Sequence, residues 1–233
     1  MLALVLVALT AQPASCTGRA GAAMADGARR ASEFDLVASA DAYALAMFRG
    51  CDDGRLASTY VRALQEARDA YAAGGSPRSL EPVRRAEAFL QGLAGGGQPV
   101  AEVARFVLMA AAAAAQSERD EMGTLLAQAV YLETLRLAAG ESGAPGVTAH
   151  EAAGELWLQV HRFETAREAF RAAARQIGIT PRIALGLART AVRLGDAPAA
   201  CEAYRTLAGL WGGRPEGAEI REARAHLVQP GCR

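Results

Sequence analysis

Lysine and asparagine are missing from this 233-residue chain, aromatic residues make up only 6% of it, and histidine occurs three times. All 25 basic side chains are therefore arginines, and 25 acidic side chains balance them. A chain without net charge or long runs of one sign lacks the positive field that nucleic-acid binding needs, so we expect no nucleic-acid partner. Arginine in place of lysine throughout is typical of a GC-rich coding sequence, so arginine content alone indicates no function.

Motifs for catalysis and metal binding are also missing. The histidines, His150, His161 and His226, do not have the spacing of an H-E-x-x-H site, and no nucleophile elbow, P-loop or dinucleotide fingerprint occurs. Acidic pairs such as Asp52-Asp53 fall at loop or solvated positions. We therefore expect a protein that is not an enzyme and has no cofactor and no metal site. The alternative is an all-helical enzyme whose catalytic groups come from distant residues.

Strand signals are absent, since no window alternates between apolar and polar residues and the β-branched residues do not cluster. Apolar residues instead recur at three- and four-residue spacing, which is typical of amphipathic helices. Helices are expected from Glu33 to before Gly50, from Leu56 to Tyr71, and at about 79–94, 99–116 and 118–138. The pattern predicts an all-α fold. Residues 33–146 form one helical region, which consists either of degenerate repeats or of a separate helical cap.

The N-terminus opens with a short apolar block from Leu2 to Leu9, followed by small and polar residues. Because a membrane span needs roughly 20 apolar residues, this block is too short to cross a bilayer. It fits the core of a secretory signal, although the usual basic residues before it are missing. We expect residues 1–22 to be a signal or lipoprotein segment and residues 23–32 to be a flexible linker. A frayed apolar N-terminus of a cytoplasmic protein is the alternative.

Cys16 follows Ala14-Ser15 and in these two positions resembles the lipobox of bacterial lipoproteins. Pro13 departs from that pattern, which has leucine three residues before the cysteine. The resemblance implies lipidation of Cys16 and membrane contact only through that anchor. Ala20-Gly21-Ala22 offers an ordinary signal cleavage site as a rival.

A 34-residue period is present in the C-terminal part of the chain. Three positions recur at this spacing: Gly154 as Ala188, Ala166 as Ala200, and Phe170 as Tyr204. The pattern resembles the tetratricopeptide repeat (TPR) family over residues 147–214, with departures at Pro181 and Ala191. The resemblance implies two repeats, each an antiparallel helical hairpin, stacked as a right-handed solenoid with Phe170 buried between units. Residues 215–233 then form a capping helix and tail.

The TPR family binds partners in a concave groove lined by the first helix of each hairpin. The resemblance places the following residues in that groove: Glu151, Glu155, Leu158 and Gln159 from the first unit, and Arg182, Leu185, Arg189 and Arg193 from the second. Arginine side chains are suited to carboxylates, so the expected partner is a protein or peptide with an acidic segment. The alternative is that these arginines merely fill exposed helical positions.

Antiparallel packing of the helix at 197–211 against the capping helix brings Cys201 and Cys232 to one end of the hairpin. In an oxidising compartment the two are expected to form a disulfide. The alternative is that Cys201 is a small core residue. Cys51 then has no partner, unless an uncleaved N-terminus or cleavage before residue 16 lets it pair with Cys16.

These features together predict a non-catalytic scaffold of the bacterial cell envelope, periplasmic or anchored to the outer membrane. It is broadly similar to the TPR lipoproteins that serve envelope assembly or pilus biogenesis. A cytoplasmic adaptor of the same architecture is the alternative, and an all-helical enzyme with a repeat tail is a further one.

Overall fold

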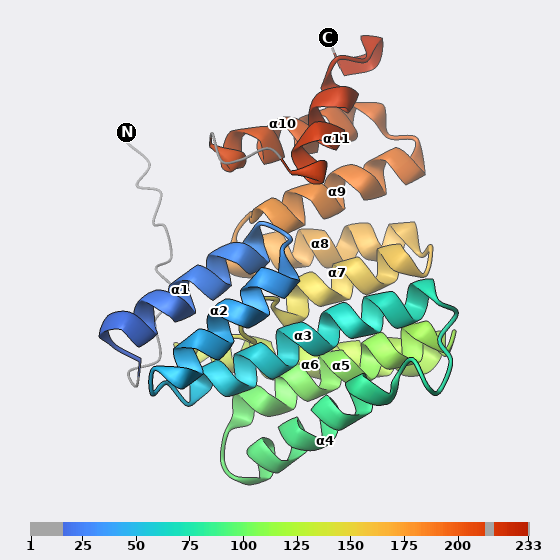
Figure 1. Ribbon diagram of the computed structural model, residues 1–233. Coiled ribbons are helices and arrows are strands. Elements are labelled where there is room, and N and C mark those ends of the chain that lie inside the picture. The colour runs from blue at the N-terminus through green and yellow to red at the C-terminus, as the bar shows by residue number, and fades with distance from the viewer. Residues whose placement is uncertain (1–15, 213–216, 233) are drawn as a thin grey trace.

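The computed structural model describes residues 16–212 and 217–232, and these residues form eleven α-helices, one short 3-10 helix and no strand (Figure 1). The expected all-α class is therefore confirmed. In chain order the elements are α1 (Gly18–Ser32), α2 (Leu36–Phe48), α3 (Asp53–Ala72), α4 (Glu81–Gly95), α5 (Pro99–Ala115), α6 (Arg119–Ala138), α7 (Ala149–Gln159), α8 (Phe163–Ile177), α9 (Pro181–Leu194), α10 (Ala197–Trp211), α11 (Ala218–Leu227) and the 3-10 helix η1 (Pro230–Cys232).

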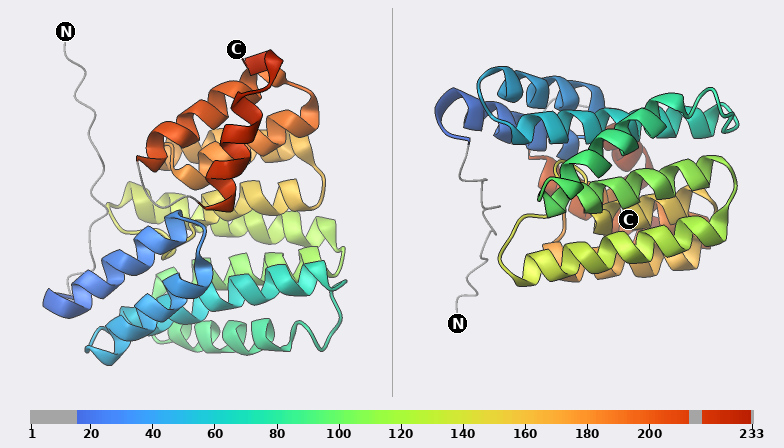
Figure 2. Two further views of the ribbon diagram at one scale, coloured as in Figure 1. Left: turned by 45° about the horizontal axis from the view of Figure 1, so that its top comes forward. Right: turned by 90° about the horizontal axis from the view of Figure 1, so that it is seen from below.

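The helices follow one another in space as they do along the chain, since each packs mainly on its neighbours in sequence. Three pairs of α-helices that are not neighbours in sequence also pack together: α3 with α5, α5 with α7, and α7 with α9. Seen from below, α1–α3 lie on one side, α6 on the other, and α4 and α5 between them (Figure 2). The main hydrophobic core extends from α1 to α7, and a second core joins α9, α10 and α11. None of the described helices is both long and apolar enough to cross a membrane.

Residues 23–32 are helical rather than a flexible linker, so that expectation was wrong. Helix α1 buries one face made of small residues, including Ala23, Gly27 and Ala31, against α2. A Cβ atom on Gly27 would lie 2.7 Å from the Tyr43 ring, so the two helices approach closely where the side chain is absent. The buried face consists of alanines and glycines and has no large aliphatic side chain, which is why residues 23–32 were not recognised as an amphipathic helix.

The helices expected between residues 33 and 138 are confirmed, with ends that differ by up to three residues. Their ends follow from local chemistry. The Asp35 side chain accepts a hydrogen bond from the Ala38 backbone N–H at the start of α2. Pro99 occupies the first position of α5, where the missing N–H costs nothing.

Helices α7 to α10 form two consecutive hairpins, with α8 also packed against α9. Thr148 and Glu151 form a capping box that begins α7. Phe170 on α8 is fully buried, as expected, and its ring contacts Gly154 on α7 and Gly186 on α9. The aromatic residue that recurs 34 positions later, Tyr204 on α10, is buried as well.

Helix α11 covers the last hairpin, in the place expected for a capping helix. Its buried residues Ile220 and Ala223 pack on the core of α9 and α10. Residues 215, 216 and 233 of the expected cap and tail lie outside the described residues. The tail then returns along α10, where η1 contacts it.

The N-terminal helices also fold onto the C-terminal hairpins. The hydroxyls of Tyr60 and Tyr71 on α3 donate hydrogen bonds to the carbonyls of Val147 (2.8 Å) and Gln159 (2.9 Å). Phe34, in the turn after α1, stacks on Trp211 at the end of α10. These contacts decide which surfaces of α7 and α9 stay accessible.

Candidate functional site

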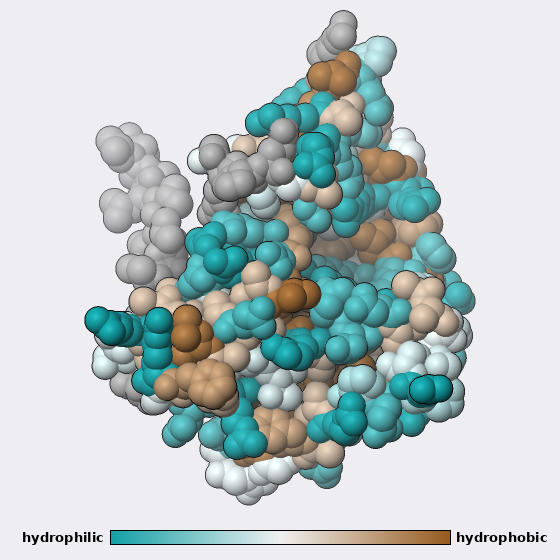
Figure 3. Space-filling view, in the orientation of Figure 1, coloured by the Kyte–Doolittle hydropathy of each residue, from teal (hydrophilic) through white to brown (hydrophobic). Residues whose placement is uncertain are grey.

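A groove of about 400 Å³ lies where α7, α9, α10 and α11 meet. We call it the C-terminal groove. Its lining residues are Leu158, Gln159, His161, Arg189, Val192, Arg193, Tyr204 and Glu222. Figure 3 shows the surface hollowed between the C-terminal helices and the helices below them, with hydrophobic residues in the hollow. Four of the eight residues expected to line a groove, Leu158, Gln159, Arg189 and Arg193, therefore do lie together.

Helix α9 supplies the cationic side of the groove. Arg189, Val192 and Arg193 are three and four residues apart and so share one helical face. Val192 is 44% exposed, and it comes three residues after Arg189 and directly before Arg193. The groove thus combines an apolar floor with guanidinium groups, a combination that suits a ligand with both apolar and acidic groups.

The carboxylate of Glu222 on α11 forms an ion pair with the guanidinium of Arg189. The guanidinium binds the carboxylate with both Nε (3.0 Å to Oε1) and Nη2 (2.6 Å to Oε2), and the Tyr204 hydroxyl donates to Oε1 at 2.7 Å. Burial alone raises the pKa of Glu222, but the hydrogen bonds from Arg189 and Tyr204 outweigh burial and hold that pKa below its ordinary value. Burial and the hydrogen bond to Glu222 raise the pKa of the Tyr204 hydroxyl.

Arg193 is exposed, and within residues 16–212 and 217–232 it has no ion-pair or hydrogen-bond partner. The C-terminal groove therefore carries one uncompensated positive charge beside Val192.

Three other residues expected in the groove, Glu151, Glu155 and Arg182, are covered by the N-terminal helices and do not line it. Glu151 is 5% exposed, and its carboxylate accepts hydrogen bonds from Thr148 and Thr180. This part of the expectation was wrong because α1–α3 pack over α7 and α9. A flexible linker at residues 23–32 would not cover these helices. Leu185 is likewise buried, in the core of α9–α11.

Glu155 and Arg182 belong instead to a partly buried ionic network. Arg182 is 2% exposed; its Nη1 lies 2.7 Å from Glu155 Oε1, and its Nη2 donates to the Ala31 carbonyl at the end of α1. Its guanidinium also lies 5.3 Å from the Phe34 ring centroid. Arg68 on α3 binds the second oxygen of Glu155. The network therefore joins α1, α3, α7 and α9.

The pKa of Glu155 reflects this network. Burial alone raises the pKa, but the charges of Arg182 and Arg68 and their hydrogen bonds outweigh burial and lower it to about 2. A neighbouring cavity of about 20 Å³, lined by Arg68, Glu155, Gln159 and apolar side chains, holds no more than a water molecule. This region therefore has a structural role.

Glu133 on α6 is a fully buried carboxylate that the sequence analysis missed. Its oxygens accept hydrogen bonds from the backbone N–H groups of Ala144 (2.8 Å) and His150 (3.1 Å), so it caps the N-terminus of α7 from outside. Burial raises its pKa more than these hydrogen bonds lower it. The only sign of this buried carboxylate in the sequence was a glutamate at a helical position where the spacing of apolar residues predicts a buried side chain. Because both oxygens are occupied and no part of the side chain is exposed, we assign it no catalytic role.

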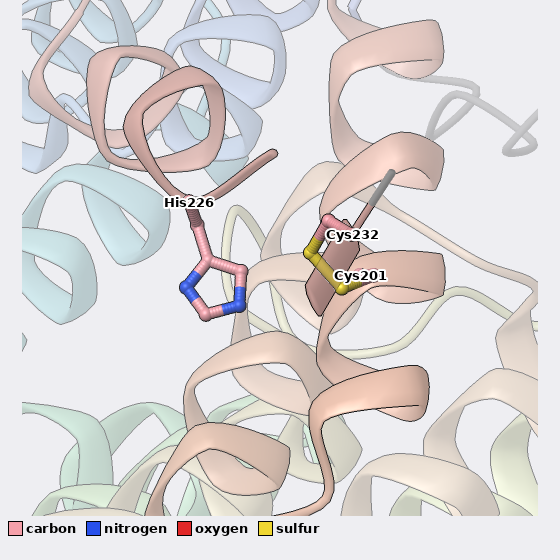
Figure 4. A group of neighbouring side chains, drawn as sticks. All are labelled: Cys201, His226 and Cys232. Carbon is pink, nitrogen blue, oxygen red and sulfur yellow. A yellow bond between two sulfur atoms is a disulfide. The ribbon is translucent and has the colours of Figure 1, made fainter. Parts of the chain in front are cut away.

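The four cysteines form two disulfides, Cys201–Cys232 and Cys16–Cys51. The first is the expected pair, and Figure 4 shows His226 directed toward it from α11. The second is the alternative pairing, and it excludes a thioether-linked lipid on Cys16 in the same molecule because one sulfur atom cannot form both bonds. In each case a third side chain lies nearby: His226 beside Cys201–Cys232, and Asp53 beside Cys16–Cys51.

No family model matches this chain, and comparisons with curated proteins and with solved structures found no match either.

Proposed function

We propose that the protein is a non-catalytic scaffold of the TPR type that binds an acidic, partly apolar segment of another protein in the C-terminal groove. The observation that carries this proposal is Arg193, an exposed guanidinium without a partner in the described part of the chain, next to the exposed Val192. A carboxylate of the partner binds Arg193, and an apolar side chain of the partner covers Val192 and Leu158. A groove whose polar groups recognise one charge and whose floor is apolar is typical of peptide recognition.

Two observations support the proposed repeat architecture. The hairpins α7–α8 and α9–α10 succeed each other, with the small and aromatic residues recurring at 34-residue spacing. Phe170 is packed where a TPR requires it, between the helices of its own hairpin and the first helix of the next. On this proposal the C-terminal hairpins stack as a right-handed solenoid, and α11 caps its apolar end.

The proposed compartment is the bacterial cell envelope. Two disulfides favour an oxidising environment, since thiols in the cytoplasm are kept reduced. The Cys16–Cys51 bond favours an exported form that keeps residue 16, hence an uncleaved N-terminus or cleavage before that residue. In a lipidated form, by contrast, Cys51 has a free thiol.

Affinity capture from the native envelope, followed by titration of the captured partner, tests the binding proposal. We expect the Arg189→Ala/Arg193→Ala variant to bind about tenfold more weakly than wild type, because it loses the Arg193 ion pair and leaves the negative charge of Glu222 uncompensated in the groove, which together cost about 1 kcal/mol or somewhat more. Added salt should reduce the affinity of wild type more than that of the variant.

Arg171 and Arg175 on α8 provide a matched control. They are also exposed, also four residues apart, and do not line the groove. Arg171→Ala/Arg175→Ala should bind like wild type. Equal affinity of the groove variant and the control variant, with both folded, would reject the proposed site.

A further inference from the structure

Three metal-ligating side chains meet at the C-terminal end of the protein. Cys201 lies in the first turns of α10, His226 in the last turn of α11, and Cys232 in η1. The two sulfur atoms and a ring nitrogen of His226 all lie within 4.8 Å of one another. Figure 4 shows the imidazole ring reaching toward the sulfur pair.

A disulfide requires only the two cysteines, so the position of His226 needs a separate explanation. Its ring packs on the Tyr204 ring with centroids 4.7 Å apart, which orients the imidazole. In the described part of the chain neither ring nitrogen has a hydrogen-bond partner. The ring is therefore held by an apolar contact while its nitrogen atoms stay available for a ligand.

The geometry points to a redox-gated zinc site, in which reduced Cys201 and Cys232 together with His226 bind Zn²⁺. Two thiolates, one imidazole and one water match a zinc site with an open position. Tetrahedral bonding at the usual Zn–S and Zn–N lengths places the ligand atoms roughly 3.5–3.8 Å apart. The sulfur atoms therefore need to separate by only about 2 Å after reduction. The imidazole nitrogen lies within 4.8 Å of both sulfur atoms and needs to approach them by roughly 1 Å at most.

The reaction sequence has two balanced steps. A dithiol reductant transfers two electrons and two protons to the Cys201–Cys232 bond, so that two thiols form and the reductant leaves as its own disulfide. Zn²⁺ then binds both sulfur atoms and the imidazole, and the two thiol protons pass to solvent. In the reverse direction a small-molecule disulfide accepts two electrons from the two thiolates and two protons from solvent, so that the Cys201–Cys232 bond forms, two small thiols leave and the ion is released.

The surrounding structure keeps the three ligands together after reduction. Helices α10 and α11 are joined by a core that includes Leu207, Trp211 and Ile220 and does not depend on the disulfide. Arg205 donates a hydrogen bond to the Cys232 carbonyl and so holds η1 against α10. Loss of the covalent bond therefore leaves Cys232 next to Cys201.

A metal titration in the Cys16→Ser/Cys51→Ser background tests the site, because only one cysteine pair then remains. The protein is reduced with a dithiol, freed of reductant without oxygen, and titrated with Co²⁺ and then with Zn²⁺. We expect one equivalent to bind, with the visible bands of tetrahedral Co²⁺ and thiolate charge-transfer absorption, and Zn²⁺ should displace the Co²⁺. The oxidised protein should bind neither ion.

His226→Gln should weaken zinc binding by at least about tenfold, since loss of a direct ligand costs at least as much as loss of an outer-shell partner. His161→Gln, a change at an exposed histidine away from the sulfur atoms, is the matched control and should leave the affinity unchanged. If the reduced protein does not bind zinc, the cysteine pair is only a structural disulfide. If His226→Gln binds zinc as tightly as His161→Gln, the imidazole is not a ligand and the proposed three-residue site is refuted. Should the background variant fail to fold, the same comparison of the two histidine variants in the reduced wild-type chain decides between these outcomes.

Discussion

Phe170 on α8 and Gly186 on α9 are packed so closely that a Cβ atom on Gly186 would lie 2.1 Å from Cζ of the phenylalanine ring. Glycine in the middle of a helix normally costs about 1 kcal/mol relative to alanine. Here the missing methyl group makes room for the aromatic ring that joins two hairpins. The contact therefore explains why a destabilising residue occupies the interior of α9.

Gly186→Ala should lower the free energy of unfolding by about 1–3 kcal/mol, because overpacking outweighs the gain in helix propensity. Urea denaturation measures the change. Gly209→Ala on α10 is the matched control, since a Cβ atom there meets nothing within 4 Å, and it should stabilise the protein by up to about 1 kcal/mol. A stabilising effect of both substitutions would contradict the packing described for Gly186.

Phe170→Ala should lower the free energy of unfolding by about 3–5 kcal/mol, as is typical when a buried aromatic ring is removed from a core. Thermal denaturation followed by circular dichroism measures it. In the Phe170→Ala background, Gly186→Ala should lose most of its penalty because its methyl group then enters the vacated space. An unchanged melting midpoint for Phe170→Ala would mean that the 34-residue register is wrong.

Acid should lower the free energy of unfolding because Glu155 becomes protonated. Its pKa is lowered from 4.5 to about 2 in the folded state, so the ionised form stabilises the fold. This stabilisation is complete above about pH 5 and is lost as the pH falls toward 2. A shift of this size corresponds to about 3 kcal/mol. Urea denaturation of wild type and Glu155→Gln at pH 7 and pH 3 measures the effect, and the difference between the two proteins should shrink at pH 3.

Glu164→Gln is the control for that experiment. Glu164 pairs with Arg167 on the surface of α8, where its side chain is 62% exposed. Surface pairs contribute little, so this variant should follow wild type at both pH values. A constant difference between wild type and Glu155→Gln across the pH range would show that the carboxylate has an ordinary pKa.

Glu222→Gln should strengthen binding of the acidic partner proposed for the C-terminal groove. The substitution removes the carboxylate that pairs with Arg189, so two guanidinium groups become available in place of one. We expect an increase in affinity of about two- to fivefold, the size of one surface ion pair. Isothermal titration with the captured partner measures it. Weaker binding by Glu222→Gln would indicate that the carboxylate itself contacts the partner.

Peptide mapping of the native protein without reductant should find the Cys201–Cys232 and Cys16–Cys51 peptides linked. Cys201→Ser/Cys232→Ser should lower the free energy of unfolding by about 3–4 kcal/mol, because the bond closes a loop of 31 residues. Free thiols at both Cys201 and Cys232 would refute the bond and weaken the case for export. A lipid on Cys16 with a free thiol at Cys51 would instead support the lipoprotein prediction.

The sequence by itself determined what depends on residues close together along the chain. Three- and four-residue periodicity predicted the helices from α2 onward, and the absence of alternation excluded strands. The 34-residue spacing of Phe170 and Tyr204 predicted that both are buried. Packing of α10 against the next helix also predicted that Cys201 meets Cys232, since a short hairpin leaves few arrangements.

Only the tertiary structure decided what depends on distant segments. Helix α1 packs through alanines and glycines, whose weak hydrophobic signal hides its buried face. Because α1 and α3 then cover α7 and α9, Arg182 pairs with Glu155 in the interior while Arg193, eleven residues later on the same helix, stays in solvent. The position of His226 also depends on the packing of segments that are distant in sequence. Its place beside two sulfur atoms follows from how α11 lies across α10, a relationship that no local pattern of residues records.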